Sequence, residues 1–417
     1  MDDHEYESRG FYRPAFFSIY LEGEFREDYE NLSNQDLGTF VHEYVHYLQN
    51  LTTINGLMSS GLYFTQIHFL KKFIAENTCF EIPLGDDFHS NAILKARDRF
   101  QMNYGYKEGL SLKYDRAEYS VEFVPDGQKQ HQMVVLHFFS RDKLLKSVEV
   151  GNLCIKESMA YLCQSFFDPD AKLLEIPYST AEILCGIIIP DLMEDKRRLI
   201  ALCYIALSSE NSGYTFYELL ISAKERYSEL SGKELINVLL KTFSVVYQGK
   251  NVTLAEMTIQ SLSIFKERLQ GMVYSNIEHF EKIIENVIMS YEERKFPLIE
   301  VLYEEKLNNA EKVKILLENY GIPHIWTRSG YNFFPKSESD QETPLEFVEL
   351  IGQRIVLDRL LGINHERLNG CCSLLPMCQK SESYGVDDNC YGTQWKREIP
   401  CPFIIVSDHW GLRDKIK

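Results

Sequence analysis

The segment from residue 34 to residue 49 has the hydrophobic spacing of an amphipathic helix. Its apolar residues recur at steps of three and four and form one broad stripe: Leu37, Phe40, Val41, Tyr44, Val45 and Leu48. His42 and His46 are four residues apart, so they lie one above the other on the opposite face. Ser33 followed by Asp36 resembles a capping box, which predicts a helix start near Asn34. We expect this helix to bury its apolar side and to present both imidazoles to a cleft.

The two histidines belong to the run His42-Glu43-Tyr44-Val45-His46, an H-E-x-x-H motif. Imidazoles one helical turn apart can bind the same metal ion, and the glutamate beside the first can act as a general base towards water. The alternative is an ordinary amphipathic helix with two incidental histidines. Because the pair lies on a well-patterned helix and off its apolar stripe, the motif favours a zinc site.

A catalytic zinc site needs a third protein ligand and one open position. Glu157 is the best candidate, because it points away from the apolar stripe of a second helical pattern. That stripe contains Ile155, Met159, Leu162 and Phe166. Ala160 is small enough to let this helix approach the first closely. The competing candidates for the third ligand are Asp168, Glu175, Glu182, His68 and His137.

With these residues the chain resembles the zincin metallopeptidases, and within them the gluzincins, whose third ligand is a glutamate on a later helix. The run from Glu157 to Ala160 matches the shorter form of the gluzincin pattern, E-x-x-A. The resemblance covers two short helices of 417 residues, and the 110 residues between His46 and Glu157 exceed the usual gluzincin interval. It implies a zincin-like core in which His42, His46 and Glu157 bind zinc and Glu43 is the general base.

The resemblance also implies hydrolysis of peptide bonds in a protein or peptide substrate. Glu43 would take a proton from the attacking water and pass it to the leaving amine. A further donor should stabilise the oxyanion, and Tyr178 and then Tyr161 are the candidates. Thr39 and Gln49 are candidates for hydrogen bonding the second ring nitrogen of each imidazole.

Two other functions remain open from the sequence. The same centre could hydrolyse a non-peptide amide or act on another small molecule. Alternatively, zinc is purely structural and the protein is a helical interaction module. A peptidase inside the cell must be restrained, so a regulatory partner is also expected.

The composition limits the partners and the compartment. A formal net charge of −17 argues against nucleic-acid binding, which needs clustered lysine and arginine. The acidic start is unlike a secretory signal peptide, and the longest apolar run, Ile183–Ile189, is too short to cross a bilayer. We therefore expect a cytoplasmic protein that binds no membrane, whose ten cysteines are reduced thiols or metal ligands.

The pattern along the chain predicts an α+β fold that is predominantly helical. Residues 1–180 would form the zincin-like core, with a small N-terminal sheet around a strand at residues 16–25 and an insert at about 79–150. Residues 181–334 read as a helical domain, and residues 345–417 as a last helix followed by a cysteine-rich tail.

The insert has the pattern of a β-hairpin. Two strand-like runs, Tyr119–Val124 and His131–Phe139, flank a turn at Pro125-Asp126-Gly127. The insert accounts for the long interval between the metal ligands. It either folds over or beside the cleft or serves as a supporting sheet.

Half of the cysteines fall within residues 371–401. Four thiolates suit a tetrahedral zinc ion, so Cys372, Cys378, Cys390 and Cys401 are predicted to form a second, structural zinc site. Cys371 and His365 are substitutes for one of these ligands. The spacing lacks a C-x-x-C knuckle, and unpaired buried thiols or a redox pair are the alternatives.

Overall fold

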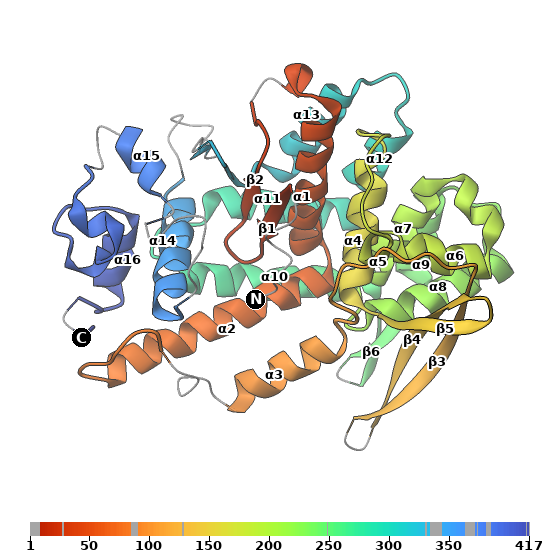
Figure 1. Cartoon of the computed structure of the whole chain (residues 1–417), viewed down its shortest axis with the longest axis horizontal. Helices are drawn as coiled ribbons and strands as arrows, with labels where there is room; N and C mark the ends of the chain where they lie inside the picture. The colour runs from red at the N-terminus through yellow and green to blue at the C-terminus, as the bar shows by residue number, and fades with distance from the viewer. Residues whose placement is uncertain are drawn as a thin grey trace.

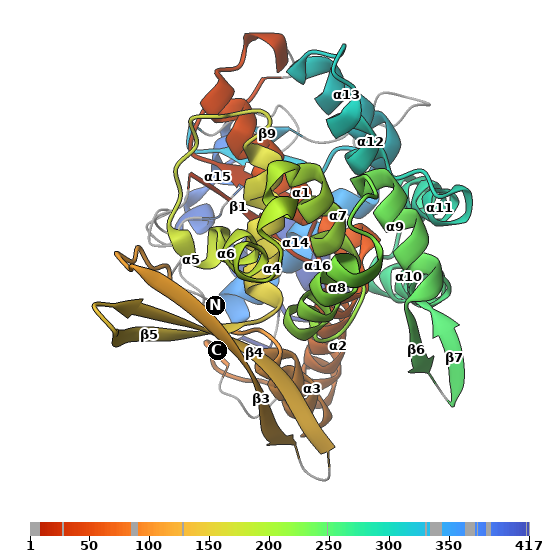
Figure 2. The ribbon, with the colours of Figure 1, turned by 90° about the vertical axis from the view of Figure 1, so that its right-hand side faces the viewer.

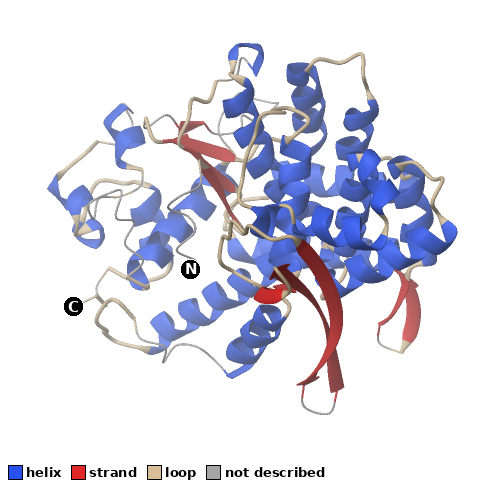
Figure 3. Ribbon diagram, turned by 45° about the vertical axis from the view of Figure 1, so that its right-hand side comes forward, coloured by secondary structure: helices blue, strands red, loops and turns tan. Residues whose placement is uncertain are grey.

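The computed structural model confirms an α+β fold with a helical majority, and Figure 3 shows how small the sheets are beside the helices. The residues that it describes are 9–26, 29–84, 91–126, 129–247, 249–329, 332–333, 344–362, 372, 374–380, 385–413 and 415–416. Within these ranges no helix is long and apolar enough to cross a membrane.

Helix α1 (Asn34–Thr52) carries the histidine motif and begins where the sequence predicts. The Ser33 hydroxyl accepts a hydrogen bond from the backbone N–H of Asp36 at 3.0 Å, which caps the first turn. The predicted apolar stripe is buried. The opposite face is less open than expected, because helix α4 (Asn152–Gln164) and the turn after it pack against it (Figure 1).

Gly38 marks the closest approach between α1 and the turn that follows α4. A Cβ atom at this position would lie 2.5 Å from the Cβ of Asp168, and the structure has no room for it. The absence of a side chain at Gly38 therefore lets the two helices that carry the histidines and Glu157 come together.

Helix α2 (Ile54–Glu76) follows α1 after a sharp turn at Thr53. The Thr53 hydroxyl donates to the Gln49 carbonyl at 2.7 Å and accepts from the Gly56 N–H at 3.2 Å, so one residue ends α1 and begins α2. Helix α3 (Asn91–Met102) comes next in the chain.

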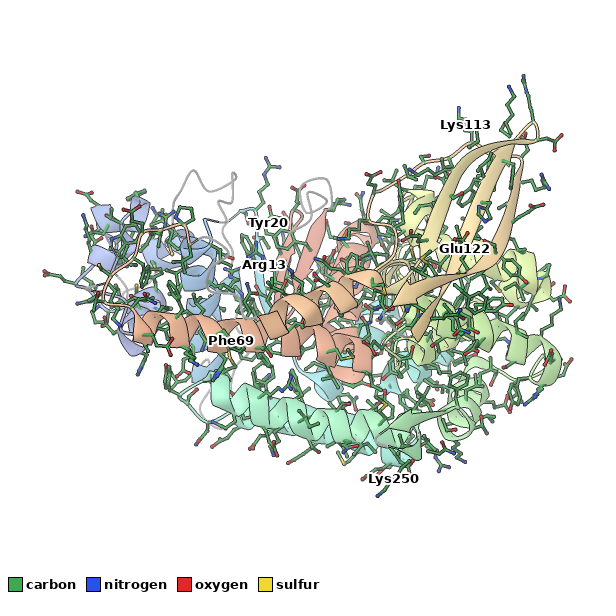
Figure 4. The ribbon with its side chains drawn as sticks, turned by 90° about the horizontal axis from the view of Figure 1, so that it is seen from below. Arg13, Tyr20, Phe69, Lys113, Glu122 and Lys250 are labelled. Carbon is green, nitrogen blue, oxygen red and sulfur yellow. The ribbon has the colours of Figure 1, made fainter. Side chains whose placement is uncertain are left out.

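The N-terminal sheet has four strands in the order β1-β2-β8-β9. They are β1 (Gly10–Arg13), β2 (Ser18–Leu21), β8 (His324–Thr327) and β9 (Asn332–Phe333). The strand predicted at residues 16–25 is shorter in the structure, because Phe17 has a φ of 47° and cannot continue a strand. Strand β8 pairs parallel to β2, so the segment predicted to be helical supplies part of this sheet. Figure 4 labels Arg13 and Tyr20 here and Glu122 on the second sheet.

The second sheet confirms the predicted hairpin and adds a third strand. Its strands, in the order β3-β4-β5, are β3 (Arg116–Asp126), β4 (Lys129–Ser140) and β5 (Lys143–Val150). Strand β5 escaped prediction because its first half, from Lys143 to Leu145, is exposed and does not alternate. Buried residues of β4 and β5 face the helices: Val134, Leu136, Phe138, Val148 and Val150. The sheet thus packs against two helices, α6 (Thr180–Ile188) and α8 (Ser212–Arg226) (Figure 2).

Most of the chain between residues 175 and 320 is helical, as expected. The helices are α5 (Glu175–Tyr178), α6 (Thr180–Ile188), α7 (Lys196–Ala206), α8 (Ser212–Arg226), α9 (Gly232–Thr242), α10 (Leu254–Met272), α11 (Glu278–Glu293), α12 (Pro297–Tyr303) and α13 (Asn309–Tyr320). A small hairpin, β6 (Ser244–Tyr247) and β7 (Lys250–Thr253), interrupts them and adds two strands to the helical domain predicted for residues 181–334. Gly249, with a φ of 77°, supplies the left-handed conformation of its turn.

The C-terminal region contains α14 (Leu345–Leu360), α15 (Leu375–Lys380), two short 3-10 turns (Asp388–Tyr391 and Gln394–Lys396) and α16 (Pro402–His409). Helix α14 packs against α16 and also reaches the N-terminal sheet, where Asp358 forms an ion pair of 3.1 Å with Arg13. Buried side chains from all three predicted segments share one core. The division at residues 180 and 345 stays a prediction.

Candidate metal centre

Three predicted ligands lie together at the contact between α1 and α4. Among the described residues, His42, His46 and Glu157 form the one group of three whose ligand atoms all lie within 4.8 Å of one another. The Oε2 atom of Glu157 is 3.3 Å from the Nε2 atom of His42 and 3.3 Å from that of His46. Both imidazoles and the carboxylate therefore face the same point, where one ion could bind them all.

The centre is largely enclosed. His42 is only 6% exposed, and the side chains of His46 and Glu157 are 13% and 18% exposed. Burial alone would raise the pKa of Glu157, but the imidazoles of His46 and His42 outweigh it and hold that pKa well below its usual value. The carboxylate is consequently ionised at neutral pH, as a metal ligand must be.

Each imidazole is fixed by a glutamine on its other ring nitrogen. The Nδ1 atom of His46 lies 2.9 Å from Oε1 of Gln49, and Nδ1 of His42 lies 3.1 Å from Oε1 of Gln164. The Gln49 amide is itself oriented, because its Nε2 donates to the Lys156 carbonyl at 3.0 Å. An amide oxygen only accepts, so Nδ1 is the donor in both contacts, and in the neutral imidazole this leaves the lone pair of Nε2 for a metal ion. The donor set therefore fits a divalent ion.

These contacts confirm one predicted supporting residue and correct another. Gln49 holds His46 as expected, but the Thr39 hydroxyl donates to the Gln35 carbonyl of its own helix at 2.8 Å. Thr39 therefore does not support an imidazole. Gln164 was missed, although it lies two helical turns after Glu157 and so on the same face of α4.

The competing ligands stand elsewhere. His137 hydrogen-bonds Ser120 and Ser147 on the second sheet, and His68 is exposed on α2. Asp168 is buried against Gly38. Within the described part of the chain, none of the alternatives joins the group around Glu157: Asp168, Glu175, Glu182, His68 and His137.

Glu43 lies beside this centre and is 5% exposed. Its side chain rests against Gly10 at the start of β1: a Cβ atom at Gly10 would lie 2.9 Å from Cγ and 3.1 Å from Oε1 of Glu43. The same atom would lie 2.9 Å from the backbone oxygen of Tyr20. The sheet therefore positions the carboxylate, and it does so only because residue 10 lacks a side chain.

Of the two predicted oxyanion donors, Tyr178 is the one whose ring contacts a ligand of the centre. Its ring centroid is 5.8 Å from that of His42. Burial, and then the charges of Glu157 and Glu43, raise the pKa of Tyr178 well above its usual value, so its hydroxyl keeps its proton. Tyr161 is different, because its hydroxyl donates to the Ala171 carbonyl at 3.3 Å.

Ser158 holds the turn that carries Tyr178. Its hydroxyl donates to the Pro177 carbonyl at 3.1 Å and accepts from the Ala181 N–H at 3.0 Å. The residue is fully buried and directly follows Glu157 on α4. The helix that supplies the third ligand thus also fixes the backbone on both sides of Tyr178.

The predicted cysteine ligands lie far from this centre in the sequence and in the fold. Cys372, Cys378, Cys390 and Cys401 line one cavity in the C-terminal region, and all four are free thiols. Cys371 and His365, the predicted substitutes, lie outside the described residues.

We expect Gln49→Ala and Gln164→Ala each to weaken metal binding about 10- to 100-fold, because an imidazole that loses this partner can rotate and change tautomer. Competition with a chromogenic chelator measures the affinity. Gln35→Ala, on the exposed first turn of α1, is the matched control and should change nothing. Unchanged affinity in both test variants would remove the supporting role.

Comparison with known proteins finds no matching family model, no matching curated protein and no matching solved structure.

Proposed function

We propose that this protein is a zinc-dependent metallopeptidase with a zincin-like core. The observation that carries the proposal is the convergence of His42, His46 and Glu157 on one point, with Glu43 next to the first ligand in the sequence and its carboxylate held against Gly10. Two imidazoles and one carboxylate are the ligand set of catalytic zinc sites with an open position. The resemblance to gluzincins rests on the same four residues.

Each residue has a defined task in this proposal. His42, His46 and Glu157 would hold the ion, which when bound supplies Lewis acidity towards water and the scissile carbonyl. Glu43 takes the proton from the attacking water and returns it to the leaving amine. The protonated Tyr178 hydroxyl donates a hydrogen bond to the oxygen on which negative charge develops.

The position of β1 supports a peptide substrate over a small amide. Strand β1 stands at the end of the order β1-β2-β8-β9, and its first residue, Gly10, lies against Glu43. In zincins an extended substrate lies along the outer strand of such a sheet. A peptide aligned with β1 would bring its backbone carbonyls past the proposed base.

The proposal is tested by digestion of a peptide library derived from a proteome. The zinc-loaded protein should generate new peptide termini that are absent with the Glu43→Gln variant and after chelation. A panel of non-peptide amides is assayed in parallel. Turnover of such amides with no peptide cleavage would replace the peptidase proposal by an amide hydrolase. Stoichiometric zinc without any turnover would leave a structural zinc site.

Tyr178→Phe is expected to lower kcat about 100- to 1,000-fold, the usual loss for one oxyanion donor, with little change in KM. Tyr161→Phe is the matched control, because its hydroxyl is already bonded to Ala171. Steady-state kinetics on one cleaved peptide compare the two variants. Equal effects from both would show that the hydroxyl of Tyr178 has no special task.

Gly10→Ala is expected to lower kcat about 100-fold while zinc stays bound. The new Cβ meets the Tyr20 backbone on one side and Glu43 on the other, and the side chain of Glu43 yields more easily than a strand. Gly186→Ala in α6, where a Cβ meets nothing within 4 Å, is the control. Kinetics and metal analysis are measured on both, and full activity in Gly10→Ala would contradict the positioning role.

A further inference from the structure

A second group of metal-binding side chains lies in the C-terminal region, away from the histidine centre. Its four cysteines come from four places in the chain: Cys372 before α15, Cys378 within α15, Cys390 in a 3-10 turn and Cys401 at the start of α16. All four line one cavity. The sequence separates them by up to 29 residues, and the fold brings them to one place.

Backbone hydrogen bonds connect the segments that carry these cysteines. The N–H of Cys372 donates to the carbonyl of Cys390 at 3.1 Å, which joins two of the four directly. The N–H of Cys378 donates to the Leu374 carbonyl at 2.9 Å, and the N–H of Cys390 donates to the Asp387 carbonyl at 3.1 Å. The first bond therefore joins two of the segments, and the other two hold the turns that carry Cys378 and Cys390.

Backbone N–H groups and a guanidinium surround the sulfur atoms of this cavity. The backbone N–H groups of Ile404 and Phe403 donate to the sulfur of Cys401, and the Arg397 guanidinium lies close to it. The backbone N–H of Leu374 donates to the sulfur of Cys372. Backbone donors two and three residues after a cysteine are the kind of partner that a metal-bound sulfur needs.

Arg397 supplies the positive charge of this cavity. Its guanidinium forms an ion pair with Asp387 at 3.2 Å and hydrogen-bonds the Gly385 carbonyl. A divalent ion with four thiolates carries two net negative charges, and a buried cation beside them offsets part of that charge. Arg397 is 2% exposed, which is costly for a cation unless anions lie close to it.

Cys163, a buried cysteine of the helical core, has a different environment. Cys163 on α4 is fully buried, and burial alone raises its pKa, without any donor or cation to oppose it. Such a cysteine packs as a small apolar residue. Cys154 and Cys185 of the core also have polar partners, so the C-terminal cysteines are distinguished by the gathering of four thiols around one cavity.

We propose that Cys372, Cys378, Cys390 and Cys401 bind a structural zinc ion in a tetrahedral site. Four sulfur ligands with no open position are the usual donor set of structural zinc. Among the described residues, only the histidine centre has three ligand atoms within 4.8 Å of one another, so the four sulfur atoms lie farther apart than in an occupied zinc site. Binding would therefore draw them inward, to about 2.3 Å from the ion. The inference does not depend on the proposed peptidase function.

The location of the site gives the ion a structural task. The C-terminal region has few helices of its own, and α16 packs on α14, which holds β1 through the Asp358–Arg13 ion pair. The end of the chain also contacts α2, where the Lys415 amine donates to the Ile74 carbonyl at 2.6 Å. A zinc ion that joins four segments would stabilise the folded C-terminal region against unfolding, in the way that disulfides or a larger hydrophobic core do in other small units.

Zinc is counted per chain on the full-length protein purified without chelator, by elemental analysis. The wild type should hold about two zinc ions, and Cys378→Ser/Cys390→Ser about one. His42→Ala/His46→Ala should also hold about one, bound by the cysteines. Cys79→Ser, an exposed cysteine outside the cavity, is the control and should keep two.

Cobalt substitution identifies the ligands even if a cysteine variant folds poorly. Wild type and His42→Ala/His46→Ala loaded with Co²⁺ should both show sulfur-to-cobalt charge-transfer absorption. A wild type with one zinc and no such absorption overturns the cysteine site and leaves the histidine centre intact. Retention of one zinc by His42→Ala/His46→Ala, with cobalt–thiolate absorption, supports the cysteine site whatever the fate of the peptidase proposal. Fewer than ten titratable thiols in the denatured, unreduced protein would indicate disulfides instead of a metal site and also overturns it.

Discussion

Replacing Glu43 by glutamine should remove hydrolysis almost completely while zinc remains bound. Glutamine has the size of glutamate and fits the same space against Gly10, but it cannot accept a proton from water. General-base catalysis usually contributes about 100- to 10,000-fold, so kcat should fall by that factor, equivalent to about 3–5 kcal/mol of activation free energy. Single-turnover cleavage of one peptide substrate, with elemental analysis of the same sample, measures both quantities.

The control for this variant is a glutamate of the same helical layer that lies far from the centre. Glu76→Gln, at the exposed end of α2, should leave kcat and zinc content unchanged. If Glu43→Gln keeps wild-type activity, Glu43 is not the base. If Glu43→Gln loses zinc together with activity, Glu43 supports the metal site, and the loss of activity is explained by the loss of zinc.

Replacing Glu157 by glutamine should release zinc and abolish activity together. The glutamine fills the same volume, so the contact between α1 and α4 is preserved. The centre, however, loses the one carboxylate among its three ligands. Removing a residue that merely supports a ligand costs about 10- to 100-fold in affinity, and removing the ligand itself should exceed that. Chelator competition gives the affinity, and the melting temperature shows whether the fold is intact.

Glu182→Gln is the matched control, because Glu182 is a partly buried glutamate on the neighbouring helix α6 and was a competing ligand in the sequence. It should retain zinc. The reverse pattern, with zinc lost from Glu182→Gln and kept by Glu157→Gln, would mean that the third ligand is misassigned and that the helices rearrange around the ion.

Features that depend on neighbouring residues were predictable from the sequence. The start of α1 at Asn34 follows from the Ser33 cap, and the hairpin follows from two strand-like runs around a turn. The position of Gln49 beside His46 follows from a spacing of three residues on one helix. These features are set by local geometry, in which the helix period or the turn alone decides which side chains meet.

Features that depend on distant pairing were predictable only in part: Glu157 was expected to join the histidines, but other distant pairings were not foreseen. Strand β8 joins β2 although about 300 residues separate them, and nothing in its own short run of residues specifies that partner. Thr39 shares the helix face of the histidines, but its hydroxyl bonds its own backbone, which a threonine on a helix can always do. Gln164 and Gly10 acquire their roles only through the packing of α4 and β1 on α1.

The amino-acid sequence by itself determined that two imidazoles lie one turn apart on the same face of one helix, with a carboxylate next to the first, because the helical period fixes the angles between residues a few positions apart. The tertiary structure decided which of many carboxylates completes the group, which amides hold the rings, and which cysteines share a cavity. The physical reason is that the relative placement of two helices depends on how their whole surfaces pack, and that packing is a sum over contacts from every part of the chain.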